Sequence, residues 1–299
     1  MYTYSAAFQI LATSSASAAE RIVQILGTVL PTTSVVDIGC ARGSWLRAWQ
    51  NAGCSDILGV DGPYIDKSAL EIPPDRFVTA DLEQTIDLGR SFDLAECMEV
   101  AEHLPQARAE SFVADLVRLA PAVLFSAATP GQGGEHHVNE QPAAYWRTIF
   151  RGHGYVPVDC LRPLLARHTD IPYWYRYNLI LYMREDRLDQ LSPLSRLFTV
   201  RDGEALADFS PWTYRLRTRV VRSLPAWICD HLSRWMAGRH ARRYRSRRAA
   251  AGVGIGHAPP DPHTGQTGGP IPPDPPCSHI PVSPARHRST DTAGTCRTS

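Results

Sequence analysis

Closely spaced cysteine pairs, zinc-binding motifs and membrane-spanning runs are all missing from this 299-residue sequence. The seven cysteines are scattered and odd in number, with no Cys-x-x-Cys pair and no histidine at zinc-finger spacing, so we expect a reduced protein without a structural metal site. No eighteen apolar residues run together, which argues against a membrane span. The first residues lack a basic leader followed by an apolar core, which argues against secretion. We therefore expect a cytoplasmic protein.

Lysine is almost absent, because Lys67 is the only lysine among 31 basic residues. The net charge of +1 conceals an asymmetry between the two parts of the chain. Residues 1–185 carry 14 basic and 21 acidic side chains, whereas residues 186–299 carry 17 basic and 9 acidic ones. Since a phosphate backbone is normally met by a basic surface, we expect that the first part does not act on nucleic acid.

Apolar, β-branched runs alternate with helix-like stretches between about residues 15 and 185. Continuous apolar runs predict strands that are covered on both faces, as in a doubly wound α/β sheet. The seven predicted strands are residues 34–39, 56–61, 76–81, 92–98, 122–128, 155–160 and 177–183.

Composition divides the chain into three parts. We expect a folded domain over residues 1–185, an arginine-rich helical extension over 186–248, and a disordered tail over 249–299, which is rich in Pro, Gly, Ser and Thr. No internal repeat is evident.

The extension has the composition of a surface helix. Residues 215–248 hold eleven arginines against a single acid, Asp230. Apolar residues at helical spacing include Trp227 and Trp235, which favours peripheral contact of residues 214–248 with anionic lipid at the inner face of a membrane. A solvated helix and a nucleic-acid patch are the alternatives.

The sharpest local signal is VVDIGCARGSW at residues 35–45, where a predicted strand enters a glycine-punctuated turn and then a helix. Gly39 and Gly43 permit the tight turn and let a ligand approach the backbone. Asp37 would sit badly beside a pyrophosphate, but it suits the amino group of a methionyl moiety. The spacing GCARG also differs from the GxGxxG of dinucleotide-binding turns.

Acidic residues follow the next two predicted strands. Asp61 is placed to accept hydrogen bonds from ribose hydroxyls, and Asp81 can accept from an exocyclic adenine amine. An isolated acid at a strand end is an ordinary turn residue, but three at successive strand ends indicate a nucleoside site.

These motifs resemble those of the class I S-adenosylmethionine (SAM) dependent methyltransferases, in the broad group with D-x-G-C-x-x-G and E-V-x-E-H motifs. Here the motifs run from Asp37 to Gly43 and from Glu99 to His103. The resemblance covers about residues 15–185 and implies a Rossmann-like, seven-stranded sheet whose last strand is antiparallel. It departs at Ala41, where many members have glycine. The SAM-binding residues that we predict are Asp37, Gly39, Cys40, Ala41, Gly43, Asp61, Gly62, Asp81, Leu82, Cys97 and Met98.

A second segment, TPGQGGEHHVNEQPAAYW, follows the fifth predicted strand. Loops at the carboxyl ends of parallel strands lie over the ligand crevice, so this segment should face the transferred methyl group. It resembles the H-V-N-x-Q-P-x-x-Y-W stretch of a subset of these enzymes often encoded with glycan biosynthesis genes. His137 is our first candidate for a catalytic base and His103 the second, because an imidazole titrates near working pH. The alternative for each histidine is a structural role.

Two other groups of residues admit ligand-binding interpretations. Four side chains of the second segment could ligate a divalent cation, although they form no recognised signature and we predict no metal. These four are Glu135, His136, His137 and Glu140. The aromatic cluster of residues 173–177 could pack against a sugar ring or, equally, within the core.

The function that we predict is methyl transfer from SAM to a small-molecule or glycan acceptor, at a hydroxyl oxygen. An N-methyltransferase acting on an amine or amino sugar fits nearly as well. An NAD-dependent oxidoreductase is disfavoured by Asp37, and a non-catalytic, membrane-associated scaffold by the three acids at the strand ends. The sequence leaves the oligomeric state open.

Overall fold

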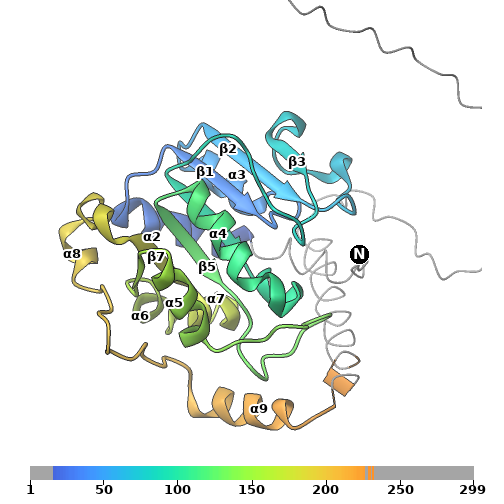
Figure 1. Cartoon of the computed structure of the whole chain (residues 1–299), viewed down its shortest axis with the longest axis vertical. Coiled ribbons are helices and arrows are strands. Elements are labelled where there is room, and N and C mark those ends of the chain that lie inside the picture. Colours follow the sequence, from blue (N-terminus) through green and yellow to red (C-terminus); the bar gives the residue numbers. More distant parts are fainter. Residues whose placement is uncertain (1–15, 226–227, 230, 232–299) are drawn as a thin grey trace, which may run out of the picture. The chain divides into compact units, whose positions relative to one another are not determined.

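The predicted strands pair into one sheet, whose order is β3-β2-β1-β4-β5-β7-β6 (Figure 1). The computed structural model of the chain describes residues 16–225, 228–229 and 231. The strands are β1 (Ser34–Ile38), β2 (Asp56–Asp61), β3 (Phe77–Thr79), β4 (Leu94–Met98), β5 (Ala122–Ser126), β6 (Tyr155–Val158) and β7 (Ile180–Arg184). Neighbours are parallel, except that β7 is antiparallel to β5 and β6. The predicted Rossmann-like sheet with its antiparallel last strand is confirmed.

Helices cover both faces of the sheet (Figure 1). They are α2 (Ala16–Val29), α3 (Ser44–Asn51), α4 (Ala109–Leu119), α5 (Ala143–Gly152), α6 (Arg162–Leu165), α7 (Tyr173–Asn178), α8 (Pro193–Arg196) and α9 (Trp212–Arg222). Helices α2, α3 and α7 contribute to the core on one face. Helices α4 and α5 contribute to the core on the other face. Burial on both faces explains why the strands read as continuous apolar runs.

Successive side chains along a strand point to opposite faces of the sheet. Val35 and Leu94 lie in the core beneath α2 and α3. Asp37 and Glu96, two residues further along the paired strands β1 and β4, therefore project toward the same face. Cys97 projects toward the opposite face and is buried in the core beneath α4.

The strand predicted at residues 177–183 begins later than expected. Residues Tyr173–Asn178 form α7, and β7 starts at Ile180. Pro172 precedes the first turn of α7, where its fixed φ favours a helix start. One face of this short helix buries Tyr175, whose ring meets Trp45 edge to face with centroids 5.2 Å apart.

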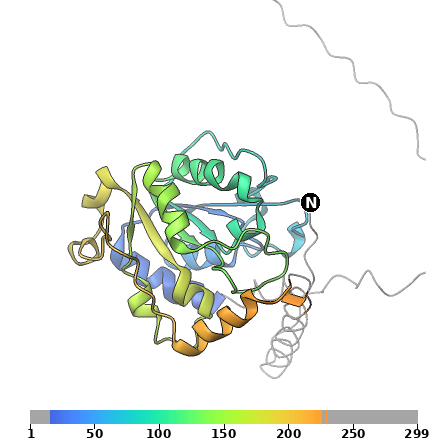
Figure 2. The same cartoon turned by 60° about the horizontal axis from the view of Figure 1, so that its bottom comes forward.

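Helix α9 packs against the loop that follows β5 (Figure 2). The Arg217 guanidinium donates a hydrogen bond of 3.1 Å to the carbonyl of Gln132. Gly131 approaches α9 so closely that a Cβ there would lie 2.1 Å from the Thr218 carbonyl oxygen. Helix α9, which lies within the predicted arginine-rich extension, thus helps to fix this loop.

Much of the predicted extension, including Trp227 and Trp235, and the whole tail from residue 249 lie outside the described residues. In the described part of the chain, no helix combines the length and apolar character needed to cross a bilayer.

Candidate functional site

The loops after β1, β4 and β5 contain the three non-glycine residues with positive φ found among the described residues. These are Ala41 (φ 48°), Glu99 (φ 56°) and His136 (φ 60°). This backbone conformation is uncommon for residues with a Cβ, and such strained positions cluster at ligand sites. Because all three loops leave carboxyl ends of strands, the strain indicates a site at that edge of the sheet.

The turn after β1 requires its two glycines. Gly39 has φ 85°, and a Cβ there would lie 2.3 Å from a methyl group of Val100. Gly43 has φ 83°, and a Cβ there would lie 2.9 Å from the side chain of Ile72. Both positions therefore combine a left-handed backbone with close packing, which only glycine tolerates.

Three buried acids, Asp37, Asp61 and Glu96, lie beside this turn. Burial, with the negative charges of Glu96 and Asp61, raises the pKa of Asp37 well above its ordinary value. One Glu96 oxygen accepts a 2.7 Å hydrogen bond from the Trp49 indole, whereas the other has no partner among the described residues. No basic side chain in the described ranges forms an ion pair with these acids. A positively charged ligand such as SAM fits this excess of buried acid.

The Glu96→Gln variant is expected to stabilise the ligand-free chain at pH 8 and to leave it nearly unchanged near pH 4. Burial raises the pKa of Glu96 to about 8, so the folded state favours the protonated acid. The natural chain should therefore lose stability as the pH rises from the unfolded pKa of about 4.5 to about 8, whereas glutamine has no proton to lose. Melting temperatures across this range measure the difference. Parallel pH profiles for the two proteins would contradict the expectation.

Asp61 anchors the turn and the end of β2. One carboxylate oxygen accepts a 2.7 Å hydrogen bond from the Ala41 amide, and the other accepts bonds of 2.6 Å from the Gly62 amide and the Tyr64 hydroxyl. A ligand hydroxyl at Asp61 would compete with that of Tyr64. Tyr64 was not among the residues predicted from sequence, although its place three residues after Asp61 was the available signal.

The side chains of the remaining predicted cofactor residues do not all lie beside the turn after β1. The side chains of Cys40, Leu82 and Cys97 are buried within the two cores, so only their backbones can face a ligand. Met98 is also buried. Asp81 is exposed, and its carboxylate accepts a 3.0 Å hydrogen bond from the Glu83 amide. The residues that gather around the turn after β1 are Asp37, Gly39, Ala41, Gly43, Asp61 and Gly62.

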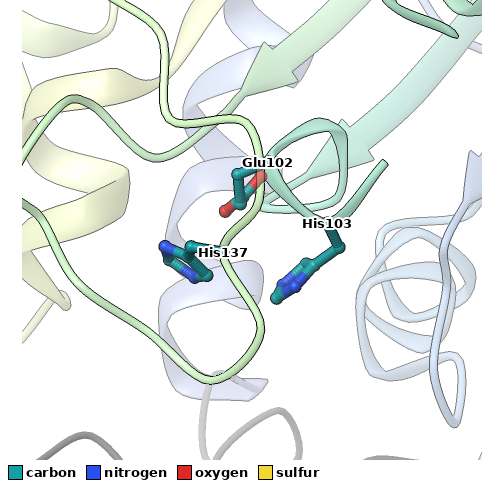
Figure 3. Close-up of side chains that lie close together, drawn as sticks. All are labelled: Glu102, His103 and His137. Carbon is teal, nitrogen blue, oxygen red and sulfur yellow. The ribbon is translucent and has the colours of Figure 1, made fainter. Parts of the chain in front are cut away.

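The loop after β5 folds back onto the turn after β4. The amides of Val138 and Asn139 donate hydrogen bonds of 2.9 and 3.0 Å to the Glu102 carbonyl. This pairing brings His137 beside His103, with ring centroids 4.9 Å apart at 83° (Figure 3). Two histidines that are 34 positions apart in sequence thereby become neighbours.

Glu140 orients His137. The Nδ1 atom of His137 donates a 2.9 Å hydrogen bond to Glu140, whose carboxylate also accepts bonds of 2.7 Å from the amides of Gly131 and Gly133. Although burial opposes ionisation, these hydrogen bonds and His137 hold the pKa of Glu140 below its ordinary value. With its proton on Nδ1, neutral His137 carries its lone pair on Nε2.

His103 is held in a similar way. Its Nδ1 atom donates a 3.1 Å hydrogen bond to the His136 carbonyl. Desolvation, together with the neighbouring His137, lowers the pKa of His103 to about 3, so this imidazole is neutral at physiological pH. A group with so low a pKa is a weak proton acceptor.

A separate cavity of about 820 Å³ is lined by neither His103 nor His137. It is formed by Thr129 and Pro130 in the loop after β5, helix α5, the end of α7, residues 202–210 and α9. Asn178 lines the cavity and donates a 2.7 Å hydrogen bond to Gln132, whose amide in turn donates to Glu99. The Tyr177 and Tyr214 rings on its wall have centroids 5.2 Å apart.

The four residues considered as cation ligands do not converge. The backbone of His136 holds His103, and Glu140 orients His137. Instead, Glu102, His103 and His137 each bring one ligand atom into a group within 4.8 Å (Figure 3). Sequence spacing alone did not pair Glu102 and His103 with a histidine in a distant loop.

Known proteins resemble this chain in sequence and in structure. Residues 11–159 match the sequence profile of a family described as a methyltransferase domain. No curated protein sequence matches the chain. DesVI from Streptomyces venezuelae is similar in structure, with 13% identity, a TM-score of 0.46, and coverage of 57% of this chain and 92% of its own. The sugar N-methyltransferase KedS8 from Streptoalloteichus has 18% identity, a TM-score of 0.43 and coverage of 58% and 87%. An O-methyltransferase family protein from Burkholderia thailandensis has 14% identity, a TM-score of 0.44 and coverage of 58% of both chains.

Proposed function

Because residues 11–159 match the profile of a methyltransferase-domain family, we propose that this chain is a SAM-dependent enzyme that methylates a hydroxyl of a small molecule or glycan. When bound, SAM supplies a methyl group on a positively charged sulfur. Asp37 and Glu96 would hold its cationic methionyl end and Asp61 its ribose, while Asp81 would accept from the adenine amine. The buried acids Asp37 and Glu96 support this assignment, because a positively charged ligand would stabilise their ionised forms, which burial disfavours.

The observation that carries the proposal of a hydroxyl acceptor is the pairing of His137 with Glu140. A hydroxyl must lose its proton as its oxygen forms the bond to the methyl carbon, while the carbon–sulfur bond breaks and its electron pair stays on sulfur. In this proposal the Nε2 atom of His137 accepts that proton. The 2.9 Å hydrogen bond to Glu140 would stabilise the resulting imidazolium.

The acceptor would enter the cavity beside α9. Its tyrosine rings offer flat faces for a sugar ring, and Arg147 and Asp208 on its wall offer polar partners. A path of hydrogen bonds runs from Asn178 through Gln132 to Glu99. It links this cavity to the carboxyl ends of the strands, where the loop with His137 begins.

Incubation of the full chain with methyl-labelled SAM and a panel of glycans and hydroxylated small molecules tests the function. We expect label in at least one hydroxylated acceptor, with one S-adenosylhomocysteine formed for each methyl group transferred. Label found only in amines would favour N-methylation instead. No transfer by a chain that binds SAM would count against the acceptor classes proposed here.

We also propose that α9 rests on anionic membrane lipid. Trp212, Leu216 and Val220 lie four residues apart and are 69%, 52% and 54% exposed, so they form an apolar stripe on the outer side of the helix. Arginines lie beside this stripe, which suits an anionic surface. These arginines are Arg215, Arg219 and Arg222.

Sedimentation with vesicles tests this contact. Vesicles that contain anionic lipid should bind the full chain, neutral vesicles should bind it weakly, and the double variant Trp212→Ser, Leu216→Ser should lose most of the binding. Because both side chains point outward, the variant should melt like the natural chain. Equal sedimentation of the two proteins would show that α9 does not contact the lipid.

A further inference from the structure

The cluster of Glu102, His103 and His137 has the composition of a transition-metal site. One ligand atom from each residue lies within 4.8 Å of the others, and Figure 3 shows the three side chains turned toward a common space. Ligands around an ion at about 2.1 Å lie roughly 3 to 4.2 Å apart, so small side-chain rotations would complete the geometry. Glu102 and His103 come from the turn after β4, and His137 from the loop after β5.

Both imidazoles are already fixed as metal ligands usually are. A ligating histidine commonly donates its second ring N–H to a carboxylate or a backbone carbonyl, which sets the tautomer and the ring orientation. Here Nδ1 of His137 donates to Glu140, and Nδ1 of His103 donates to the His136 carbonyl. Each ring therefore has its lone pair on Nε2.

The carboxylate of Glu102 lacks the partners that a buried acid needs. The residue is fully buried, and neither carboxylate oxygen has a hydrogen-bond partner in the described part of the chain. The carboxylates of Glu99 and Glu140 lie nearby and add to the negative charge around Glu102. The amides of Glu102 and Ala128 also lie near this carboxylate, but neither forms a hydrogen bond of normal geometry with it. A cation would supply what this carboxylate lacks.

We propose that Glu102, His103 and His137 bind one divalent first-row transition ion, such as Mn²⁺ or Zn²⁺. Two imidazoles favour such ions over Mg²⁺, which prefers oxygen ligands and keeps its water. Three protein ligands leave coordination positions open, as in catalytic sites.

This inference rests on the proposed methyl transfer to a hydroxyl and changes one part of it. An acceptor hydroxyl bound to the ion has a lowered pKa, so its O–H bond breaks with the electron pair left on oxygen, and the proton passes to water. In the loaded enzyme His137 is then a ligand of the ion. Glu140 is a positioning residue that acts through His137.

The test measures ion binding without any acceptor. The full chain is dialysed against a chelator and titrated with Mn²⁺, and free Mn²⁺ is followed by electron paramagnetic resonance; Zn²⁺ and Mg²⁺ are compared in competition. We expect one Mn²⁺ per chain, displaced by Zn²⁺ more readily than by Mg²⁺. The melting temperature should rise by about 5 to 10 °C at an ion concentration of roughly 100 times Kd.

Matched variants locate the site. Glu102→Gln and His137→Ala should each weaken Mn²⁺ binding by at least about 100-fold, and Glu140→Gln by about 10- to 100-fold. His153→Ala, which removes a histidine beside Glu110 in the first turn of α4, should bind as the natural chain does. Because the introduced amide resembles the protonated acid, Glu102→Gln should melt no lower than the natural chain without ion.

Absence of Mn²⁺ and Zn²⁺ binding by the folded chain would overturn the metal site, as would unchanged binding in both Glu102→Gln and His137→Ala. Methyl transfer by a chain that binds no ion would leave the proposed function standing with His137 as the base. Ion binding that responds to these variants would support the metal site even if no hydroxyl acceptor were methylated.

Discussion

The Asp61→Ala variant is expected to bind SAM about 10- to 100-fold more weakly than the natural chain. A hydrogen bond to a charged group contributes about 1.5 to 3 kcal/mol, and every 1.4 kcal/mol changes affinity tenfold. The carboxylate also accepts a hydrogen bond from the Ala41 amide, so its removal should loosen the turn after β1 as well. Isothermal titration of the full chain with SAM and S-adenosylhomocysteine measures the effect.

Tyr64→Phe is the matched control for this prediction. It removes the hydroxyl that now donates to Asp61 but keeps the carboxylate and the aromatic ring. If a ribose hydroxyl takes the place of the Tyr64 hydroxyl, this variant should bind SAM as well as the natural chain or better. Unchanged affinity in Asp61→Ala would place the ribose elsewhere. If the folded natural chain did not bind SAM at all, a non-catalytic scaffold would become the better account.

The His137→Ala variant is expected to lower kcat by about 10²- to 10⁴-fold, with little change in the affinity for SAM. Positioned proton transfer contributes about this much to catalysis. His137 lies in the loop after β5, apart from the acids that would hold the cofactor, so the two measurements should separate. Steady-state rates on a hydroxylated acceptor give kcat, and titration with SAM gives the affinity.

Gly134→Ala tests the same feature without removing the imidazole. A Cβ on Gly134 would lie 1.9 Å from Nε2 of His137, so the ring must move. We expect this variant to lose activity as well, whereas His153→Ala should keep it. A His137→Ala enzyme that retained nearly full rate would point to an amine acceptor, because an amine that is neutral in solution needs no base.

Local sequence was sufficient for the sheet because most strands are buried on both faces; β3, whose Val78 and Thr79 are exposed, is the exception. The runs at residues 34–39 and 122–128 are largely apolar, and both became central strands. The predicted start of β7 was wrong because aromatic residues suit strands and short buried helices alike. Pro172 and the contact between Tyr175 and Trp45 favour the helix.

The turn after β1 was also determined locally. Gly39 and Gly43 carry positive φ values that other residues would adopt only with strain, so their positions identify the turn in any context. Asp37 and Asp61 follow because strands that run parallel end at the same edge. The sequence did not show which acids lack a counter-charge, because burial and the hydrogen bond from the Trp49 indole exist only in the folded protein.

By itself, then, the sequence determined the α/β sheet, the glycine turn and the acids at the strand ends, since these depend on periodicity and on backbone conformation within a few residues. Only the tertiary structure decided that His137 meets His103 and Glu102, that Glu140 orients His137, and that α9 covers the loop after β5. These contacts join segments that are distant along the chain, and hydrogen bonds between loops, which no local pattern encodes, hold them together.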